Sequence, residues 1–112
     1  MRIIERKEKD ITILDLEGRI TIGEGDVQLR EAIHYLLGRG SKHILLNMAR
    51  VSYMDSSGVG ELIGCFQTAK AKGAEFKLLN LSRKIQDVLH VAQLLSVFEY
   101  FDSEDVALAS FT

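Results

Sequence analysis

The sequence predicts an α/β fold: a single domain over residues 1–112 with a mixed, mostly parallel β-sheet and about four α-helices. Three observations predict it. Short apolar segments typical of strands alternate with amphipathic segments typical of helices, which favours a sheet with helical crossovers. Only a short turn separates the first two strand segments, so they are expected to pair antiparallel. The length of 112 residues and the hydrophobic fraction of 46% suit one core of ordinary size.

The first half of the chain is expected to hold three strands and one helix. RIIER and ITILDLEG, the latter ending at Gly18, are predicted strands joined by a turn at KEKD. The segment RITIGEG could extend the second strand before it loops through Gly23 and Gly25. Asp26 is a suitable N-cap for an amphipathic helix that ends at Gly38 or Gly40. The apolar stripe of this helix consists of Leu29, Ile33, Leu36 and Leu37. The continuous apolar run KHILLNM is predicted to be the central strand, covered on both faces.

The second half continues the alternation. A helix is predicted after DSSG, and Gly73 closes it. Its apolar stripe consists of Val59, Leu62, Ile63, Phe66 and Ala69. EFKLLN is the next predicted strand, and Ser82 is expected to cap the helix that follows it. VFEYF and DSEDVALASF are predicted to form a short last strand and a terminal helix with acidic residues in its first turn.

Composition excludes several classes of function. Fourteen Lys and Arg residues against sixteen Asp and Glu residues give a net charge of −2 without a basic stripe, so we expect no nucleic-acid binding. No apolar run approaches the roughly 18 residues of a membrane span. The N-terminus MRIIERKEKD lacks the features of a signal peptide. We therefore expect a cytoplasmic protein that has no membrane partner.

Cysteine and histidine give no indication of a metal site or a nucleophile. Cys65 is the only cysteine, so no internal disulfide can form, and its place in a predicted helix favours packing in the core. The three histidines, His34, His43 and His90, lie far apart without the spacing of metal ligands. No metal site and no cofactor are expected.

The segment YMDSSGVGELIG, residues 53–64, joins the predicted central strand to the next helix. In open α/β sheets, ligands and partners are met at the edge where parallel strands end. A hydrolase elbow needs the pattern G-x-S-x-G, which is absent here. Gly58, Gly60 and Gly64 do not have the spacing of a dinucleotide fingerprint, and without a lysine they form no P-loop.

A helix cap and a modification site are the two remaining interpretations. Ser56 or Ser57 could cap the helix, which is worth about 1 kcal/mol. Two hydroxyls beside Asp55 exceed this need, and capping leaves Gly58 and Gly60 unexplained, since glycine weakens a helix. A phosphate at this helix start would meet free N–H groups. It would also add almost two negative charges beside Asp55, which would repel a bound partner.

The stretches VSYMDSSGVGELIG and AKAKGAEFKLLNLSRKIQDVLHVAQL resemble the anti-sigma factor antagonists of bacteria, which belong to the STAS domain family. The likeness covers nearly the whole chain. The block of aspartate, serine, serine or threonine, and glycine after an apolar strand is quite specific. The resemblance implies one STAS domain that regulates transcription by partner switching and is not an enzyme.

The resemblance also implies the site and its partners. In the family, a serine/threonine kinase that doubles as an anti-sigma factor phosphorylates the serine directly after the motif aspartate, which is Ser56 here. The unphosphorylated antagonist binds the kinase and frees the sigma factor, and a metal-dependent serine phosphatase restores the released, phosphorylated form. The kinase holds ATP and magnesium, so no cofactor is needed. The residues expected to bind the partner are Asp55, Ser56, Ser57, Gly58, Gly60 and Gly64.

One feature departs from the family pattern. Family members carry an acidic pair after the second strand, in a glycine-Glu-x-Asp pattern that contributes to partner binding. Here Arg19 and Thr21 stand at those positions, and the nearest acidic residues are Glu24 and Asp26. The alternative function therefore keeps the STAS fold and changes the target, either to a different signalling protein or to a role as an unphosphorylated scaffold or transporter subunit.

Overall fold

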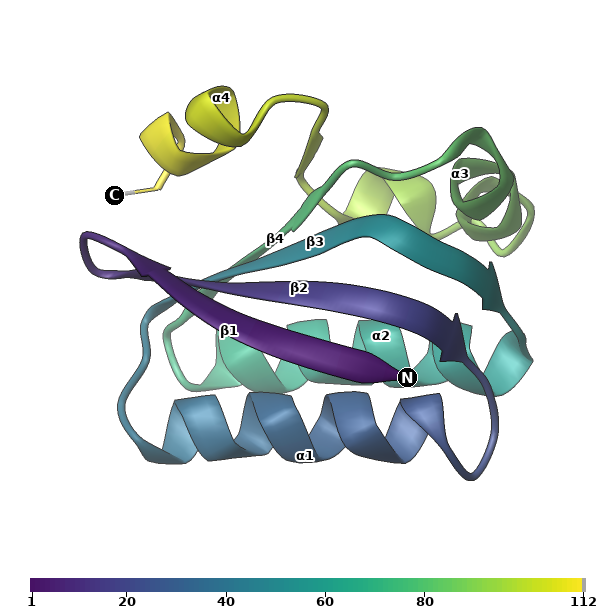
Figure 1. Cartoon of the computed structure of the whole chain (residues 1–112), viewed down its shortest axis with the longest axis horizontal. Helices are drawn as coiled ribbons and strands as arrows, with labels where there is room; N and C mark the ends of the chain where they lie inside the picture. The colour runs from purple at the N-terminus through teal and green to yellow at the C-terminus, as the bar shows by residue number, and fades with distance from the viewer. Residues whose placement is uncertain (112) are drawn as a thin grey trace.

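The computed structural model describes residues 1–111 and contains a β-sheet with helices on both faces (Figure 1). The strands and helices alternate as the sequence predicts. Their bounds are β1 Arg2–Glu8, β2 Ile11–Ile20, α1 Gly25–Gly38, β3 His43–Met54, α2 Ser56–Ala71, β4 Glu75–Leu79, α3 Arg83–Val91, the 3-10 turn η1 Leu95–Val97, β5 Tyr100–Phe101 and α4 Glu104–Ala109. The expected domain span also includes Thr112, which lies outside the described residues.

The five strands lie in the order β1-β2-β3-β4-β5. β1 is antiparallel to β2 and each later pair is parallel, which confirms the predicted mixed sheet. Figure 1 shows α1 and α2 side by side on one face and α3 and α4 on the other. β2 and β3 end where α1 and α2 begin, on the right of Figure 1. We call this end, formed by residues 19–25 and 53–60, the carboxyl edge.

Strand β3 is the middle strand, and its first half is buried on both faces, as the apolar run KHILLNM predicts; its second half, up to Met54, extends beyond this run and is partly exposed. Ile44 and Leu46 belong to the larger core, to which α1 and α2 contribute. Leu45 belongs to a smaller core that includes Ala107 of α4. Because successive strand residues face opposite sides, a strand between two helical layers requires an uninterrupted apolar run.

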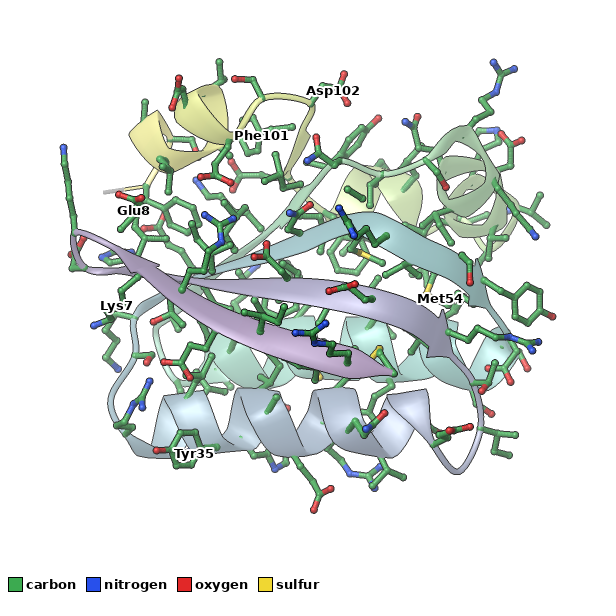
Figure 2. The ribbon with its side chains drawn as sticks, in the orientation of Figure 1. Lys7, Glu8, Tyr35, Met54, Phe101 and Asp102 are labelled. Carbon is green, nitrogen blue, oxygen red and sulfur yellow. The ribbon has the colours of Figure 1, made fainter. Side chains whose placement is uncertain are left out.

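The hairpin between β1 and β2 lies at the end opposite the carboxyl edge. Figure 2 shows Met54, the last residue of β3, at one end of the molecule and Lys7 and Glu8 at the other. β1 continues through Glu8, further than the sequence indicates, so that only Lys9 and Asp10 form the turn. The positive φ of Lys9, 58°, lets the chain reverse within two residues.

Asp26 does not cap α1, contrary to the sequence prediction. The helix begins at Gly25, its N-cap residue is Glu24, and no side chain caps it. Asp26 is buried in the first turn, where its Oδ1 accepts a hydrogen bond of 2.7 Å from the N–H of Val27. Of the two acidic residues after β2, only Glu24 is therefore exposed.

The C-terminal elements follow the predicted order, with a shorter strand. Ser82 caps α3 as predicted, its hydroxyl accepting a hydrogen bond of 3.2 Å from the N–H of Ile85. Of the segment VFEYF, only Tyr100 and Phe101 pair with β4. No helix among residues 1–111 combines the length and the apolar character that crossing a bilayer requires.

Cys65 packs in the core, as its place in a helix predicts. It lies on the buried side of α2 with Leu62 and Ala69. Burial raises the pKa of its thiol to about 12, and the nearby Glu61 carboxylate adds to this effect. A thiol with such a pKa is inert as a nucleophile near neutral pH.

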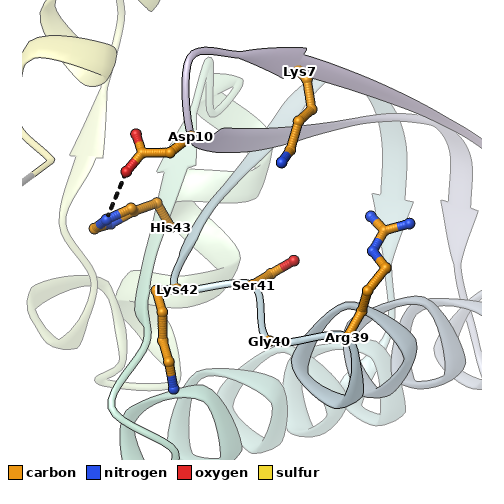
Figure 3. A pocket seen from close by; sticks show the side chains of 7 residues that line it. All are labelled: Lys7, Asp10, Arg39, Gly40, Ser41, Lys42 and His43. Carbon is orange, nitrogen blue, oxygen red and sulfur yellow. Dashed lines mark ion pairs between the residues drawn. The ribbon is translucent and has the colours of Figure 1, made fainter.

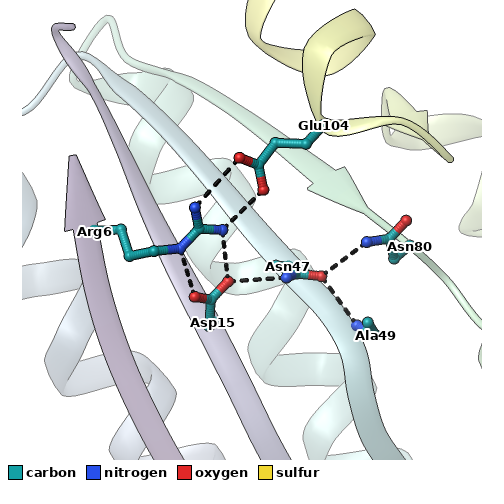
Figure 4. A network of polar contacts seen from close by, with 6 residues as sticks. All are labelled: Arg6, Asp15, Asn47, Ala49, Asn80 and Glu104. Atoms are coloured by element: carbon teal, nitrogen blue, oxygen red, sulfur yellow. Dashed lines mark hydrogen bonds and ion pairs between the residues drawn. The ribbon is translucent and has the colours of Figure 1, made fainter. Parts of the chain in front are cut away.

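A polar network joins β1, β2, β3 and α4. Figure 4 shows the guanidinium of Arg6 between the carboxylates of Asp15 and Glu104, to which it donates hydrogen bonds of 2.6 to 3.2 Å. Asn47 donates a hydrogen bond of 2.8 Å to Asp15 and accepts one of 3.2 Å from Asn80. The hydrogen bonds from Arg6 hold the pKa of Asp15 below its usual value, although burial acts in the opposite direction.

Candidate functional site at the carboxyl edge

Asp55 caps α2. Its Oδ1 accepts a hydrogen bond of 2.8 Å from the N–H of Gly58, and its Oδ2 accepts one of 3.0 Å from the N–H of Ile22. Its own N–H donates to the carbonyl of Ile20 at 3.3 Å. The hydrogen bonds from Gly58 and then Ile22 hold the pKa of the Asp55 carboxyl below its ordinary value. Asp55 therefore joins the start of α2 to the loop that follows β2.

Neither serine is the cap residue, so the capping interpretation of Ser56 and Ser57 is wrong. Both lie in the first turn of α2, where Ser56 is exposed and Ser57 is half-buried. Within residues 1–111, the hydroxyl of Ser56 makes no side-chain hydrogen bond. Because Asp55 does the capping, the Ser56 hydroxyl is free at the surface, at the positive end of a 16-residue helix.

Gly58 is buried, and the fold itself requires a glycine there. A Cβ on Gly58 would collide with the carbonyl oxygen of Ile20 and lie 2.8 Å from Cγ of Met54. Gly25 is constrained in the same way, because its Cβ would collide with the carbonyl oxygen of Arg19. The starts of α1 and α2 thus both pack against the end of β2. The small residues at the start of α2 predict that another surface comes close, and at Gly58 this surface is the end of β2 in the same chain.

Gly60 and Gly64 are not required by the fold. A Cβ on Gly60 would meet nothing within 4 Å, and one on Gly64 would meet only the Glu61 carboxylate, at 4.0 Å. Ser56, Gly60 and Gly64 follow at intervals of four residues, so they share one side of α2. The free hydroxyl therefore stands at one end of a strip of helix surface that carries no side chains.

Sequence reasoning misses two exposed side chains at this edge. Ile22 is 73% exposed in the loop after β2, and Tyr53 is 37% exposed near the end of β3. Large apolar side chains that gather at one surface are typical of protein interfaces. The signal for Ile22 was present in the segment TIGEG, because an isoleucine among polar residues and glycines belongs to no buried stripe.

A hollow of about 500 Å³ lies at the other end of the sheet, beside the hairpin. Figure 3 shows Lys7 and Arg39 on two sides of it. Arg39 already forms an ion pair of 2.7 Å with Glu5, and His43 lies 3.4 Å from Asp10. Among residues 1–111, no three His, Cys, Asp or Glu side chains are grouped to hold a metal ion. The hollow is a weaker candidate than the carboxyl edge, because its Arg39 and His43 already face carboxylates, whereas the Ser56 hydroxyl makes no hydrogen bond within the described residues.

The profile of the STAS domain matches residues 2–107, nearly the whole of this chain. The chain belongs to the STAS domain family. The anti-sigma-B factor antagonist of Bacillus subtilis is 30% identical over 96 residues, which cover 86% of this STAS chain and 85% of that protein. The anti-sigma F factor antagonist of Paenibacillus polymyxa is 23% identical over 108 residues, which cover 96% of this chain and 92% of that protein.

Solved structures of similar proteins share the fold. A crystal structure of an anti-sigma factor antagonist from Mycobacterium paratuberculosis superposes with a TM-score of 0.85 at 15% identity, covering 97% of this chain and 92% of that one. The STAS fold expected from the sequence is therefore confirmed, including its mostly parallel sheet and its four α-helices. In this STAS domain, the aspartate-serine-serine-glycine segment lies at the carboxyl edge.

Proposed function

We propose that this STAS protein is an anti-sigma factor antagonist that regulates transcription by partner switching. Unphosphorylated, it binds an anti-sigma serine/threonine kinase in the cytoplasm, and the kinase then releases its sigma factor. The kinase phosphorylates Ser56 and dissociates, and a metal-dependent serine phosphatase returns the antagonist to its binding form. The observation that carries the proposal is the free, exposed Ser56 hydroxyl directly after the capping Asp55.

The phosphoryl transfer requires only the Ser56 hydroxyl from this chain. Its oxygen attacks the γ-phosphorus of the ATP that the kinase holds with magnesium. The new Oγ–P bond replaces the bond to ADP, and the hydroxyl proton passes to a base of the kinase. A hydroxyl without an intramolecular hydrogen bond enters the kinase site without first breaking one. The chain thus acts as a substrate and a binding partner and supplies no cofactor.

Release of the partner is proposed to occur at the surface, with the fold intact. A phosphate at the start of α2 is favoured by the positive end of the helix. It adds a charge of about −1.5 to −2 beside Asp55. A partner that packs on the strip formed by Gly60 and Gly64 must desolvate this charge. Because the partner binds the neutral form, its surface there is not expected to carry a cation that would compensate the cost of desolvation. The phosphorylated complex therefore separates.

Labelling with radioactive ATP tests the acceptor. Wild type, Ser56→Ala and Ser57→Ala would each be incubated with the anti-sigma serine kinases of the native host. Ser57→Ala is the matched control, because it removes the neighbouring hydroxyl of the same turn. We expect label on wild type and on Ser57→Ala only. Label on Ser56→Ala would contradict the assignment, and absence of label and of binding with every kinase would contradict the proposed function.

Gly60→Gln tests the docking strip. The new side chain would cover the strip beside Ser56 without a clash inside the domain, since a Cβ has open space there. Gly38→Gln is the matched control, because Gly38 is also a helical glycine with open space but lies at the far end of α1. We expect Gly60→Gln to weaken kinase binding by about tenfold or more and Gly38→Gln to leave it unchanged. If Gly60→Gln and Gly38→Gln bind the kinase equally well, the docking site does not include α2.

A further inference from the structure

Arg19 differs from the other arginines in the part of the chain that the structure describes. Each of the others has a carboxylate oxygen within 4.0 Å. These pairs are Arg2–Glu17, Arg6–Asp15, Arg30–Glu61, Arg39–Glu5, Arg50–Glu17 and Arg83–Asp87. Arg19 has no such partner among residues 1–111, and its guanidinium carbon lies 5.2 Å from the centre of the Tyr53 ring. No carboxylate of the described residues therefore neutralises its charge.

Lys84 approaches the same ring. Its Nζ lies 5.3 Å from the centre of the Tyr53 ring, and it too has no carboxylate partner within residues 1–111. Arg19 and Tyr53 are register partners on β2 and β3, whereas Lys84 comes from the first turn of α3. Three separate elements thus bring two unpaired cations to one partly exposed aromatic ring. We call Arg19, Tyr53 and Lys84 the basic–aromatic cluster.

The cluster borders the proposed switch. Tyr53 precedes the capping Asp55 by two residues, and Arg19 precedes Ile20, whose carbonyl accepts the Asp55 N–H. The exposed Ile22 is held at the same edge by its hydrogen bond to Asp55. One edge therefore combines an exposed aliphatic side chain, a ring, two cations, the free Ser56 hydroxyl and the carboxylates of Glu24 and Asp55. These are the components of an interface with an apolar centre and a charged rim.

We propose that the basic–aromatic cluster determines which partner this protein binds, by docking against an acidic surface of the partner. This inference rests on the proposed function and specifies the chemistry of the partner. The planar guanidinium of Arg19 presents paired N–H donors suited to a carboxylate, and the ring fixes its orientation. A partner with a basic surface is rejected by the same two charges, because like charges brought together in an interface repel.

Calorimetric titration with the kinase that labels Ser56 tests the inference. The variants are Arg19→Glu, Lys84→Glu and, as the control, Arg83→Glu, which inverts a neighbouring charge on α3 that is already paired with Asp87. We expect Arg19→Glu and Lys84→Glu to weaken binding by about tenfold or more at low salt, and Arg83→Glu by less than about threefold. Added salt should weaken the wild-type complex more than the Arg19→Glu complex.

Two further measurements separate the possible failures. Ser56→Asp is titrated in the same series: if it loses affinity while Arg19→Glu and Lys84→Glu bind as wild type does, the inference is overturned and the proposed function stands. If no kinase binds, the proposed function fails. The same variants are then titrated with the protein to which wild type cross-links in host extract. If Arg19→Glu and Lys84→Glu bind that protein with wild-type affinity, the inference is overturned. Sedimentation of the free chain tests whether a second copy of the chain binds to the cluster instead. Self-association that is lost in Arg19→Glu would assign the cluster to a dimer contact and overturn the proposal.

Discussion

Asp55 connects two segments that lie far apart in the sequence. One carboxylate oxygen caps α2 through Gly58, and the other holds the loop after β2 through Ile22. The residue that a motif comparison treats as a partner contact therefore has a structural task inside the domain. Its effect on binding is expected to come through the position of Ile22 as well as through direct contact.

Asp55→Ala should lower the midpoint of thermal unfolding by several degrees, because both hydrogen bonds are lost at once. Asp55→Asn keeps one acceptor oxygen and should fall between the alanine variant and wild type. Hydrogen exchange at the N–H groups of Gly58 and Ile22 reports the two contacts separately. An alanine variant with the wild-type midpoint and wild-type exchange would show that the cap contributes nothing.

Ser56→Asp should keep the wild-type thermal midpoint or raise it slightly while losing affinity for the kinase. A negative group at a helix N-terminus is favourable by about 0.3–1 kcal/mol, and repulsion from Asp55 offsets part of this gain. A carboxylate carries less charge than a phosphate, so the loss of affinity is expected to be partial. Unfolding and binding are measured on one sample. A midpoint several degrees lower would mean that the switch works by disordering the helix.

At this scale the sequence identifies the segment better than the role of each residue in it. Aspartate and serine both cap helices, so composition alone does not say which of Asp55, Ser56 and Ser57 accepts the N–H bond. Asp55 also accepts a hydrogen bond from the N–H of Ile22, in a loop more than thirty residues earlier in the chain, and this second bond favours Asp55 as the cap. Contacts between distant segments of this kind leave no local pattern.

Helix α2 contains glycines of two different kinds. Gly58 packs against the backbone of β2, whereas Gly60 faces open space. We expect Gly58→Ala to destabilise the domain by about 1–3 kcal/mol, because the backbone of Ile20 cannot move aside. Gly60→Ala should stabilise it by about 0.5–1 kcal/mol, because alanine is the better helix former.

Urea unfolding of the two alanine variants measures both effects. The pair shares one helix and one chemical change, so only the surroundings of the Cβ differ. If Gly58→Ala were as stable as Gly60→Ala, the contact between α2 and the end of β2 would be looser than the structure describes.

Periodicity predicts the order and type of the elements well and their ends less well. Apolar alternation and helical stripes reflect burial, and burial extends through the middle of each element. β1 and β2 continue beyond their apolar runs, to Glu8 and Ile20, because backbone pairing does not require apolar side chains. In VFEYF, Phe98 fills the core from the end of the 3-10 turn and Val97 is exposed, so only the last two residues form a strand.

At the scale of the whole molecule, two polar contacts fasten α4 to the sheet. Arg6 binds Glu104, and the buried Lys77 of β4 donates hydrogen bonds of 2.9 and 3.0 Å to the carbonyl and hydroxyl of Ser110. Lys77 is only 3% exposed, which its place in an apolar strand segment does not reveal. A buried lysine is found where the fold provides partners for it, and here Ser110 is joined by the carboxylates of Glu75 and Glu99, 3.6 and 3.5 Å from Nζ.

Stability should fall more steeply with acid in wild type than in Asp15→Asn. The pKa of Asp15 is depressed in the folded state by Arg6, so its contribution is fully present above the ordinary aspartate pKa of about 4 and is lost as the pH falls towards the folded value. Urea unfolding between about pH 3 and pH 6 measures this difference. The asparagine variant should be less stable at the upper end and approach wild type at the lower end. Parallel curves would show that the Arg6–Asp15 contact is equally strong in the unfolded chain.

The two ends of the described chain lie at different distances from the carboxyl edge. The carbonyl of Met1 accepts a hydrogen bond of 3.0 Å from the side chain of Gln28 in α1, close to the carboxyl edge, whereas α4 lies towards the opposite end of the molecule (Figure 1). A bead, fluorophore or fused protein attached ahead of Met1 would crowd the edge, and one attached beyond α4 would leave it accessible. On an orientation-controlled biosensor, chains tethered beyond α4 should therefore capture the partner at higher occupancy than chains tethered through the amino group of Met1.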